Sequence, residues 1–303
     1  MNIAIIGSGS IGLLYAAYLQ EKHAVTLFTN RNGQANRLTS EGLTLQAFND
    51  TKNISVKAYP MTSLMENKEF YDLVIVAVKQ YHLSEVVPSL RNLPKQTSLL
   101  FLQNGMGHLE LLHTLENTTI FVGTVSHGAY RLDDTSVSHR GLGSTNIALF
   151  KGKKEPVFSK LTMMGASFSF EFKEEYYLLL LEKLVINSVI NPLTAIFKIT
   201  NGELFHNEHF CSIAKSLYEE LETVYQNLSV VCPFEQIKEI GKKTGHNRSS
   251  MLSDIENGRQ TEIDAILGYT LSIAEKQNNR LSLVPLLYKG IKGEELRGRK
   301  QSG

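Results

Sequence analysis

The sequence predicts an α/β protein in which a doubly wound parallel sheet is followed by an all-helical domain. Over the first part of the chain, short apolar runs, each long enough for one buried strand, alternate with helical segments. Beyond Lys173 the runs become long amphipathic segments with the helical period. We therefore expect a sheet domain at residues 1–170 and a helical domain at residues 171–303, and a chain of 303 residues can build a core in each.

The individual elements follow from these patterns in chain order. In the first domain, strands are predicted at Asn2–Ile6, Ala24–Phe28, Asp72–Val78, Ser98–Gln103 and Ile120–Val125, and helices begin near Ser10, His82 and Met106. In the second domain, helices are predicted at Tyr176–Phe197, Asn207–Leu228, Phe234–Lys243 and Thr261–Gln277. The basic C-terminal segment from Lys289 is expected to be a solvated, partly frayed end.

Composition and charge exclude several classes of function. A formal net charge of +1 provides no field for nucleic acid or for an anionic membrane surface. The two cysteines, Cys211 and Cys232, have neither a metal-binding nor a redox spacing, so no metal is expected. Because the N-terminus opens directly into a strand, no signal peptide is predicted and the expected compartment is the cytoplasm. The expected partner is a small molecule, and the oligomeric state stays open with a homodimer as one candidate.

The helix predicted at Tyr176–Phe197 is apolar except for one polar stripe. Lys183, Asn187 and Asn191 are four residues apart, so at about 100° per residue they fall on one side. A polar stripe on an apolar body indicates a buried helix that presents an ammonium group and two amides to a cavity. Two alternatives compete with this interpretation. A membrane span would bury Glu182 and Lys183 at roughly 2.5–3.5 kcal/mol each, and a simple core helix would let the lysine reach solvent.

A glycine motif, GSGSIG, stands between the first strand and the first helix, which is the context in which GxGxxG indicates dinucleotide binding. Gly7 permits a tight turn, Gly9 lets the backbone approach a pyrophosphate, and Gly12 allows helix and strand to pack closely. The helix N-terminus then faces the phosphates. The expected cofactor loop consists of Gly7, Ser8, Gly9, Ser10, Ile11 and Gly12. We therefore predict a Rossmann-type domain; the alternative is an ordinary glycine loop.

The second strand ends without an acidic residue. An acidic side chain there would bind the ribose 2′-hydroxyl of NAD and repel a 2′-phosphate, so its absence beside Arg31 indicates NADPH. Thr29 and Asn30 can donate hydrogen bonds to a phosphate but carry no charge, so the preference is expected to be modest. The alternative is that Arg31 is only a solvated loop charge.

Polar residues also follow two later strands of the predicted sheet. Lys79 and Asn104 each come directly after a strand, and ligands of doubly wound sheets bind outside the carboxyl ends of the strands. Both residues are therefore expected to line the cofactor, as is the backbone near Ala129 after a further strand. Alternatively, Asn104-Gly105 is only a turn dipeptide.

Glu262 is expected at the start of a helix in the second domain. Gly258 breaks one helix, and Gln260 or Thr261 can cap the next, which places Glu262 in its first turn. A glutamate there can simply complement the helix dipole, or it can be the carboxylate that a buried Lys183 requires.

Two adjacent serines, Ser249 and Ser250, precede a predicted helical run in the same region. Their hydroxyl groups either cap that helix or hold a ligand carboxylate.

Six motifs occur together and in order. They are GSGSIG, VAVKQ at Val76–Gln80, LQNGMG at Leu102–Gly107, LEKLVINSVINPLTA at Leu181–Ala195, NGEL at Asn201–Leu204 and SSMLSDIENGRQTEID at Ser249–Asp264. In this combination, which spans nearly the whole chain, the sequence resembles the ketopantoate reductase (2-dehydropantoate 2-reductase) family. The resemblance implies NADPH-dependent reduction of 2-dehydropantoate to pantoate, a step of pantothenate and hence coenzyme A biosynthesis.

Matching the motifs residue by residue implies a set of roles. Lys183 would be the proton donor. The substrate would be held by Asn187, Asn191, Asn201 and Ser250. The cofactor would be lined by Lys79, Asn104, Ala129 and Glu262, with Asn104 near both ligands. Burial lowers a lysine pKa and a neighbouring carboxylate raises it, so Glu262 is also expected to keep Lys183 charged and thereby to take part in catalysis.

One departure from the family pattern lies at the second strand. Many members have arginine where this chain has Asn30 followed by Arg31, which bears on the strength of the NADPH preference. Two other functions stay open. A related NADP-dependent reductase of another 2-keto acid or imine would keep the glycine loop and the lysine but not the set of polar residues expected to hold 2-dehydropantoate. A non-catalytic NADPH-binding regulator would have no reason to bury Lys183.

Overall fold

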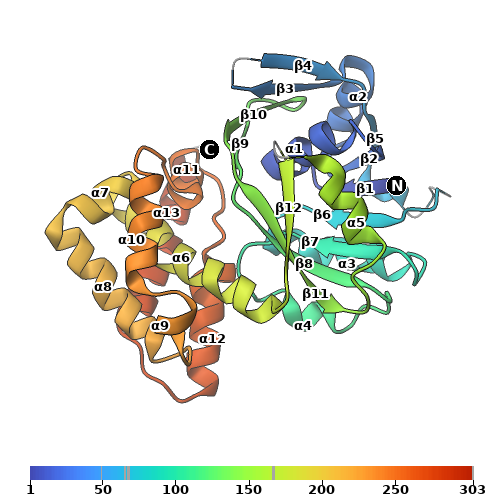
Figure 1. Cartoon of the computed structure of the whole chain (residues 1–303). Helices are drawn as coiled ribbons and strands as arrows, with labels where there is room; N and C mark the ends of the chain where they lie inside the picture. Colours follow the sequence, from blue (N-terminus) through green and yellow to red (C-terminus); the bar gives the residue numbers. More distant parts are fainter. Residues whose placement is uncertain (49, 65, 67–68, 166–167, 302–303) are drawn as a thin grey trace. The chain divides into compact units, whose positions relative to one another are not determined.

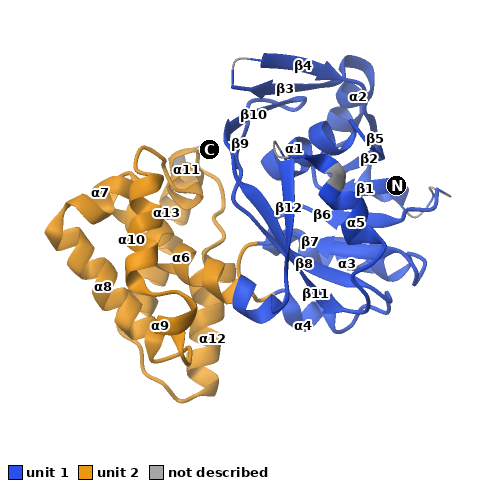
Figure 2. Ribbon diagram, viewed as in Figure 1, with its two compact units in different colours: residues 1–103, 108–179 blue, residues 104–107, 180–303 orange. Residues whose placement is uncertain are grey.

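The computed structural model describes residues 1–303 except 49, 65, 67–68, 166–167 and 302–303 (Figure 1). The chain forms two compact units (Figure 2). Unit 1 contains Met1–Gln103 and His108–Leu179, and unit 2 contains Asn104–Gly107 and Leu180–Gly303. The division falls after the expected boundary at residue 170. It also assigns the turn Asn104–Gly107 to the helical unit, although this turn follows a strand of the sheet.

Unit 1 is built on an eight-stranded sheet with the strand order β12-β11-β8-β7-β6-β1-β2-β5. In chain order, these strands are β1 (Asn2–Ile6), β2 (Ala24–Thr29), β5 (Lys57–Pro60), β6 (Leu73–Val76), β7 (Ser98–Phe101), β8 (Ile120–Val125), β11 (Ser144–Lys151) and β12 (Ser169–Lys173). The central strands β1, β6 and β7 are buried or nearly so on both faces, which explains why their sequences read as continuous apolar runs.

The six strands from β8 to β5 are all parallel, as the alternating pattern predicts. The last two strands depart from that expectation. β11 pairs antiparallel with β8, and β12 pairs parallel with β11. β8 and β11 are joined through two further strands instead of a crossover helix, and such a connection permits antiparallel pairing.

The carboxyl ends of the central parallel strands share one edge of the sheet. Ile6 of β1 is in register with Phe28 of β2 and with Val76 of β6, which is itself in register with Phe101 of β7. The chain leaves β1 on one side to form β2 and later continues on the other side through β6 and β7. This reversal is a topological switch point, where ligands of doubly wound sheets bind.

A second, four-stranded sheet was not predicted from the sequence. Its order is β4-β3-β10-β9, formed by β3 (Leu43–Ala47), β4 (Asp50–Ile54), β9 (Gly128–Arg131) and β10 (Ser136–Gly141). Helix α1 (Ser10–Leu19) contacts β1 and β2 of the large sheet and also β3, β9 and β10 of the small one (Figure 1). Because α1 is covered on two sides, its residues from Gly12 to Leu19 are all buried. They form the centre of the unit 1 core.

The remaining helices of unit 1 are short. They are α2 (Asn32–Glu41), α3 (Leu83–Arg91), α4 (Leu109–Leu112) and α5 (Val157–Leu161), with single 3₁₀ turns η1 (Met61–Leu64), η2 (Gln80–His82) and η3 (Thr162–Met164). The helix expected near His82 begins one residue later. The one expected near Met106 begins at Leu109, because the intervening residues form the turn that belongs to unit 2.

Unit 2 is helical throughout, as predicted. Its helices are α6 (Tyr176–Phe197), whose residues from Leu180 onward belong to this unit, α7 (Asn201–His206), α8 (Glu208–Glu222), α9 (Leu228–Val231), α10 (Phe234–Lys243), α11 (Ser250–Glu256), a π-helical turn η5 (Asp264–Gly268), α12 (Tyr269–Lys276) and α13 (Leu283–Gln301). α6 and α10 have the predicted bounds. The helix predicted at Asn207–Leu228 is shorter, because Asn207 is its N-cap and its helical hydrogen bonding ends at Glu222.

Helix α6 is long and apolar enough to cross a membrane by length and composition, with a mean hydropathy of 1.4. However, 78% of that apolar stretch is buried inside the protein. A buried core helix passes the same test of length and hydropathy, so this helix is weak evidence for a span.

From Lys289 to Gln301 the C-terminal segment is helical and not the frayed end expected from its charge, and residues 302–303 lie outside the described part of the chain. Helix α13 continues to Gln301, with Ile291 fully buried and Glu295 only 6% exposed. The Glu295 carboxylate accepts hydrogen bonds from the backbone N–H and the hydroxyl of Thr261, at 2.8 and 2.7 Å. The helix is thus fixed by a buried polar contact that its sequence does not reveal.

Candidate active site

The glycine loop after β1 has the geometry expected for each of its glycines. Gly7 has φ of +107°, and a Cβ there would lie 2.9 Å from the backbone nitrogen of Val78. A Cβ at Gly12 would overlap the carbonyl oxygen of Gly7. By contrast, a Cβ at Gly9 would meet no atom within 4 Å. Gly7 and Gly12 are therefore required for the local packing, whereas Gly9 leaves open space in front of the loop.

The N-terminus of α1 is free to bind an anion. Its N-cap residue Gly9 makes no side-chain capping bond, so the first backbone N–H groups of the helix are available. The Ser10 hydroxyl accepts a hydrogen bond from the backbone N–H of Arg131 at 3.1 Å, which leaves its own proton for an acceptor such as a phosphate oxygen. Half-buried Ile11 follows in the first turn.

The side chains of Ser8 and Gln34 are hydrogen-bonded to each other and stabilise this loop. Ser8 is 7% exposed and donates its hydroxyl proton to Gln34 Oε1 at 2.7 Å. The Gln34 amide in turn donates to the carbonyl oxygens of Ser8, at 3.1 Å, and of Asp134, at 2.9 Å. The Ser8 hydroxyl is therefore engaged in a hydrogen bond within the protein, and only the Ser8 backbone can bind a ligand.

Arg31 lies at the end of β2, as the sequence indicates, but its side chain has a partner. Its guanidinium forms an ion pair with Asp134, which lies in the turn between β9 and β10. The backbone N–H groups of Asn32 and Gly33 stand at the start of α2, which has no side-chain cap, and helix N-termini of this kind can bind an anion. Thr29 is fully buried and donates its hydroxyl to the carbonyl oxygen of Arg31 at 2.8 Å. The expectation that Thr29 donates to a phosphate is therefore wrong, whereas Asn30 is exposed.

Lys79 and Ala129 lie in unit 1 on segments that follow β6 and β8. Lys79 precedes the 3₁₀ turn η2, is half-buried, and has its ammonium group 5.9 Å from the ring centroid of Tyr81. Ala129 is half-buried on β9, opposite His139. Because β6 ends at the switch-point edge of the sheet, Lys79 stands at the edge where a dinucleotide is expected.

In unit 2, three of the predicted residues form a hydrogen-bonded chain. Asn104 Nδ2 donates to Glu262 Oε2 at 2.7 Å, and Asn187 Nδ2 lies 3.5 Å from Asn104 Oδ1, at the limit of a hydrogen bond. A carboxylate only accepts, so Glu262 turns the Asn104 amide nitrogen toward itself and the amide oxygen toward Asn187. The Asn187 nitrogen then faces Asn104, and its carbonyl oxygen is the atom left for a ligand hydroxyl.

The turn that carries Asn104 fits closely against the helical unit. Gly105 has φ of +79°, and a Cβ there would overlap the backbone carbonyl of Ala265 in the π-helical turn η5. Glu262 is placed just before that turn by Thr261, whose hydroxyl accepts the Ile263 N–H at 3.2 Å. π-Helical turns are often found at functional sites. This packing explains why Asn104 belongs to unit 2.

Lys183 lies on α6 one turn before Asn187 and is half-buried. Burial lowers the pKa of its ammonium group, and the charge of Glu182 opposes that shift. The chain neighbour Glu182 is thus a carboxylate that raises the Lys183 pKa, and the same role expected of Glu262 stays a prediction. Gln236 holds Glu182 by a hydrogen bond of 2.6 Å.

The polar stripe of α6 continues through Asn191, which is 7% exposed, to Thr194. The Thr194 hydroxyl donates to Ser249 Oγ at 2.8 Å, and Ser249 Oγ also accepts the N–H of Leu252 at 3.1 Å. Ser249 is therefore the N-cap of α11, and Ser250 is its exposed first residue. The Thr194–Ser249 contact thus places the start of α11 beside α6, and the Ser250 hydroxyl has no part in the capping bond.

Asn201 begins α7 and has a different set of contacts. Its amide donates to Thr244 Oγ1 at 3.0 Å, and its backbone N–H donates to the carbonyl oxygen of Asn247. Its Oδ1 is buried with no hydrogen-bond partner among the described residues. These contacts do not tie Asn201 to the α6 stripe, but the unpartnered oxygen is available to a ligand donor.

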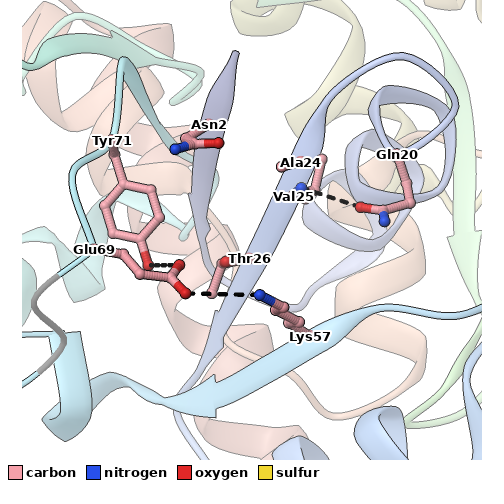
Figure 3. Close-up of a pocket in the computed structure, with 8 residues that line it drawn as sticks. All are labelled: Asn2, Gln20, Ala24, Val25, Thr26, Lys57, Glu69 and Tyr71. Atoms are coloured by element: carbon pink, nitrogen blue, oxygen red, sulfur yellow. Dashed lines mark hydrogen bonds and ion pairs between the residues drawn. The ribbon is translucent and has the colours of Figure 1, made fainter.

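A cavity of about 310 Å³ lies elsewhere in unit 1 (Figure 3). Its lining consists of Asn2, Gln20, Ala24, Val25, Thr26, Lys57, Glu69 and Tyr71. Asn2, Ala24 and Lys57 are the first residues of β1, β2 and β5, so the cavity is at the amino ends of the strands, opposite the switch-point edge. It is not the candidate active site. Among the described residues, no cluster of His, Cys, Asp or Glu is arranged to hold a metal ion.

Several residues that support the candidate site were not found from the sequence. They are Gln34, Asp134, Glu182, Thr194 and Glu295. Thr194 could have been found, because it extends the polar stripe of α6 by one further turn. The others act through contacts between segments distant in the chain or as chain neighbours with no pattern of their own.

Comparison with known proteins gives matches over both units. The family described as ketopantoate reductase PanE/ApbA matches residues 3–152, and ketopantoate reductase PanE/ApbA C terminal matches residues 176–295. The chain is 40% identical over 296 residues to the 2-dehydropantoate 2-reductase of Listeria innocua, with 97% of each chain covered.

Solved structures show the same similarity. A probable 2-dehydropantoate 2-reductase from Bacillus subtilis has a TM-score of 0.85 and 38% identity, covering 97% of this chain and 100% of that chain. A D-mandelate dehydrogenase complex with NADH and anilino(oxo)acetate has a TM-score of 0.88, covering 99% of this chain and 100% of that one, but its 22% identity shows the shared fold alone. With its glycine loop, its α6 stripe and matches along both units, this chain belongs to the ketopantoate reductase PanE/ApbA family.

Proposed function

We propose that the protein catalyses the NADPH-dependent reduction of 2-dehydropantoate to pantoate, and thereby serves pantothenate and coenzyme A biosynthesis. The observation that carries this proposal is the polar stripe of α6, in which Lys183, Asn187 and Asn191 lie on one side of an otherwise apolar core helix. Its relatives with 38–40% identity over nearly the whole chain are 2-dehydropantoate 2-reductases.

The cofactor fits the residues of unit 1. The open space at Gly9 and the free N-terminus of α1 suit a pyrophosphate, and Ser10 keeps a proton for it. Arg31 and the start of α2 suit a 2′-phosphate. Lys79 and the backbone at Ala129 stand on segments that follow the sheet edge where the dinucleotide would extend. When bound, NADPH supplies the hydride that attacks the keto carbon.

Lys183 is the proposed general acid. Negative charge develops on the keto oxygen during reduction, and an ammonium group near it stabilises that charge and delivers the proton. The pKa of Lys183 is lowered by burial, which brings it closer to the range in which a proton is readily given up. Glu262 contributes by fixing Asn104, which in turn orients Asn187.

The substrate is held by the remaining polar groups of unit 2. Asn187 accepts from the substrate hydroxyl through its free carbonyl oxygen, and Asn191 lies one turn further along the same face. Ser250, at the exposed start of α11, donates to the carboxylate, which the N-terminal end of a helix also favours. The unpartnered Oδ1 of Asn201 is a further acceptor.

The test is NADPH oxidation on addition of 2-dehydropantoate, followed with wild-type protein and with Lys183→Ala. We expect turnover by the wild type, and a kcat about 10²–10⁴-fold lower in the variant with NADPH binding retained. Other 2-keto acids and cyclic imines serve as competing substrates. Faster turnover of one of these than of 2-dehydropantoate would assign a different reaction to the same site, and an absence of turnover with all of them would reject the reductase proposal.

We also propose that the enzyme acts in the cytoplasm as a homodimer. A dimeric ketopantoate reductase from Staphylococcus aureus shares the fold, with a TM-score of 0.78 at 20% identity. Light scattering coupled to size-exclusion chromatography tests the dimer, and a mass of 33.9 kDa in solution would contradict it.

A further inference from the structure

The guanidinium group of Arg31 is already paired inside the protein. Its partner, Asp134, comes from the β9–β10 turn, 103 residues further along the chain. The Arg31 side chain is 56% exposed and that of Asp134 is 25% exposed, so the pair stands at the surface where a ligand can reach it. An acidic residue is thus present beside the end of β2, although no acidic residue follows β2 in the sequence.

Asp134 is held in this position by its backbone. Gln34, which is only 3% exposed, donates to the Asp134 carbonyl oxygen and also to that of Ser8 in the glycine loop. On the other side, the Asp133 carboxylate accepts the backbone N–H of Thr135 at 2.7 Å and so fixes the turn. The Asp134 backbone is therefore linked through Gln34 to the glycine loop, which holds the carboxylate near Arg31.

We infer that Asp134 is a specificity-determining residue that weakens the preference for NADPH over NADH by competing with the 2′-phosphate for Arg31. This inference rests on the proposed use of NADPH. A 2′-phosphate carries a charge of about −1.5 to −2 at neutral pH, and must share Arg31 with the Asp134 carboxylate or displace it. NADH has no such phosphate, so it leaves the ion pair intact. An exposed ion pair is weak, so NADPH still binds and the discrimination is reduced but not abolished.

The test measures dissociation constants of NADPH and NADH by cofactor fluorescence, without keto acid, for wild-type protein and Asp134→Asn. Asparagine keeps the backbone bond to Gln34 and removes the charge. We expect NADPH to bind roughly three- to tenfold more tightly and NADH to change less than about twofold. The matched control is Glu41→Gln. It removes the same charge from the other end of α2, where Glu41 pairs with Arg37, and we expect both dissociation constants to stay within about twofold.

A double-mutant cycle with Arg31→Ala shows whether Asp134 acts through Arg31. In the Arg31→Ala background, Asp134→Asn should change NADPH affinity by less than about twofold. Unchanged or weaker NADPH binding in Asp134→Asn alone, with an unchanged melting temperature, would overturn the inference. An equal gain in NADPH affinity in the presence and absence of Arg31 would also overturn it, because the Asp134 charge would then act by repelling the phosphate directly and not through Arg31. If the wild type bound neither cofactor, the proposed function itself would fail.

Discussion

Replacement of Gly105 by alanine tests whether the turn after β7 is fixed by its contact with the helical unit. Gly105 has φ of +79°, a conformation that costs an L-residue about 1–2 kcal/mol. The added Cβ would also overlap the carbonyl oxygen of Ala265, which belongs to the backbone and cannot rotate away. Forced shifts of this kind cost about 1–3 kcal/mol. The sum, about 2–5 kcal/mol, predicts a melting temperature lower by roughly 5–15 °C.

The same substitution should also impair catalysis, because Asn104 adjoins Gly105 and would move with it. Displacing a positioning group by about 1 Å can cost about 10²-fold in rate, so kcat/KM should fall by that order. The assay is thermal unfolding with steady-state kinetics. The matched control is Gly293→Ala, at an exposed helical position in α13 where a Cβ meets nothing within 4 Å. It should raise stability by about 0.5–1 kcal/mol. Wild-type stability and activity in Gly105→Ala would refute the reasoning.

Three further outcomes follow from the site and its surroundings. Because burial lowers the pKa of Lys183 and the acid must be protonated, kcat should fall as pH rises through a value below the usual 10.5. Lys183→Arg should shift this fall in kcat to a higher pH. Ser249→Ala removes the N-cap of α11, so it should cost about 0.5–2 kcal/mol of stability and leave KM unchanged. Ser250→Ala should raise the KM for 2-dehydropantoate roughly tenfold and leave stability unchanged. Burial lowers the pKa of His108 to about 4, so the unfolded chain binds more protons and stability should drop by about 3 kcal/mol between pH 6.5 and 4. In urea titrations over the same pH range, the free energy of unfolding of His108→Leu should fall less than that of the wild type.

Part of the candidate site was predictable because its signals are local. The polar stripe of α6 follows from a spacing of four residues, and the helix has the predicted bounds. The glycine loop follows from a strand, three glycines and a helix within about twenty residues, and the structure gives Gly7 and Gly12 the tight contacts that the motif requires. The sequence could not reveal that Ser249 takes the cap and leaves Ser250 exposed, because both hydroxyls suit either role.

The sequence by itself determined the parallel sheet, the helical second unit, the buried helix with its polar stripe and the set of candidate site residues. Only the tertiary structure decided which of these residues meet. It decided that Asn104, at the end of a sheet strand, packs into the helical unit against Glu262 and Asn187, and that Arg31 is paired with Asp134. The physical reason is that hydrophobic period and turn chemistry act over a few neighbouring residues. Pairing between distant polar groups depends on how the folded chain brings their backbones together, and no local pattern records it.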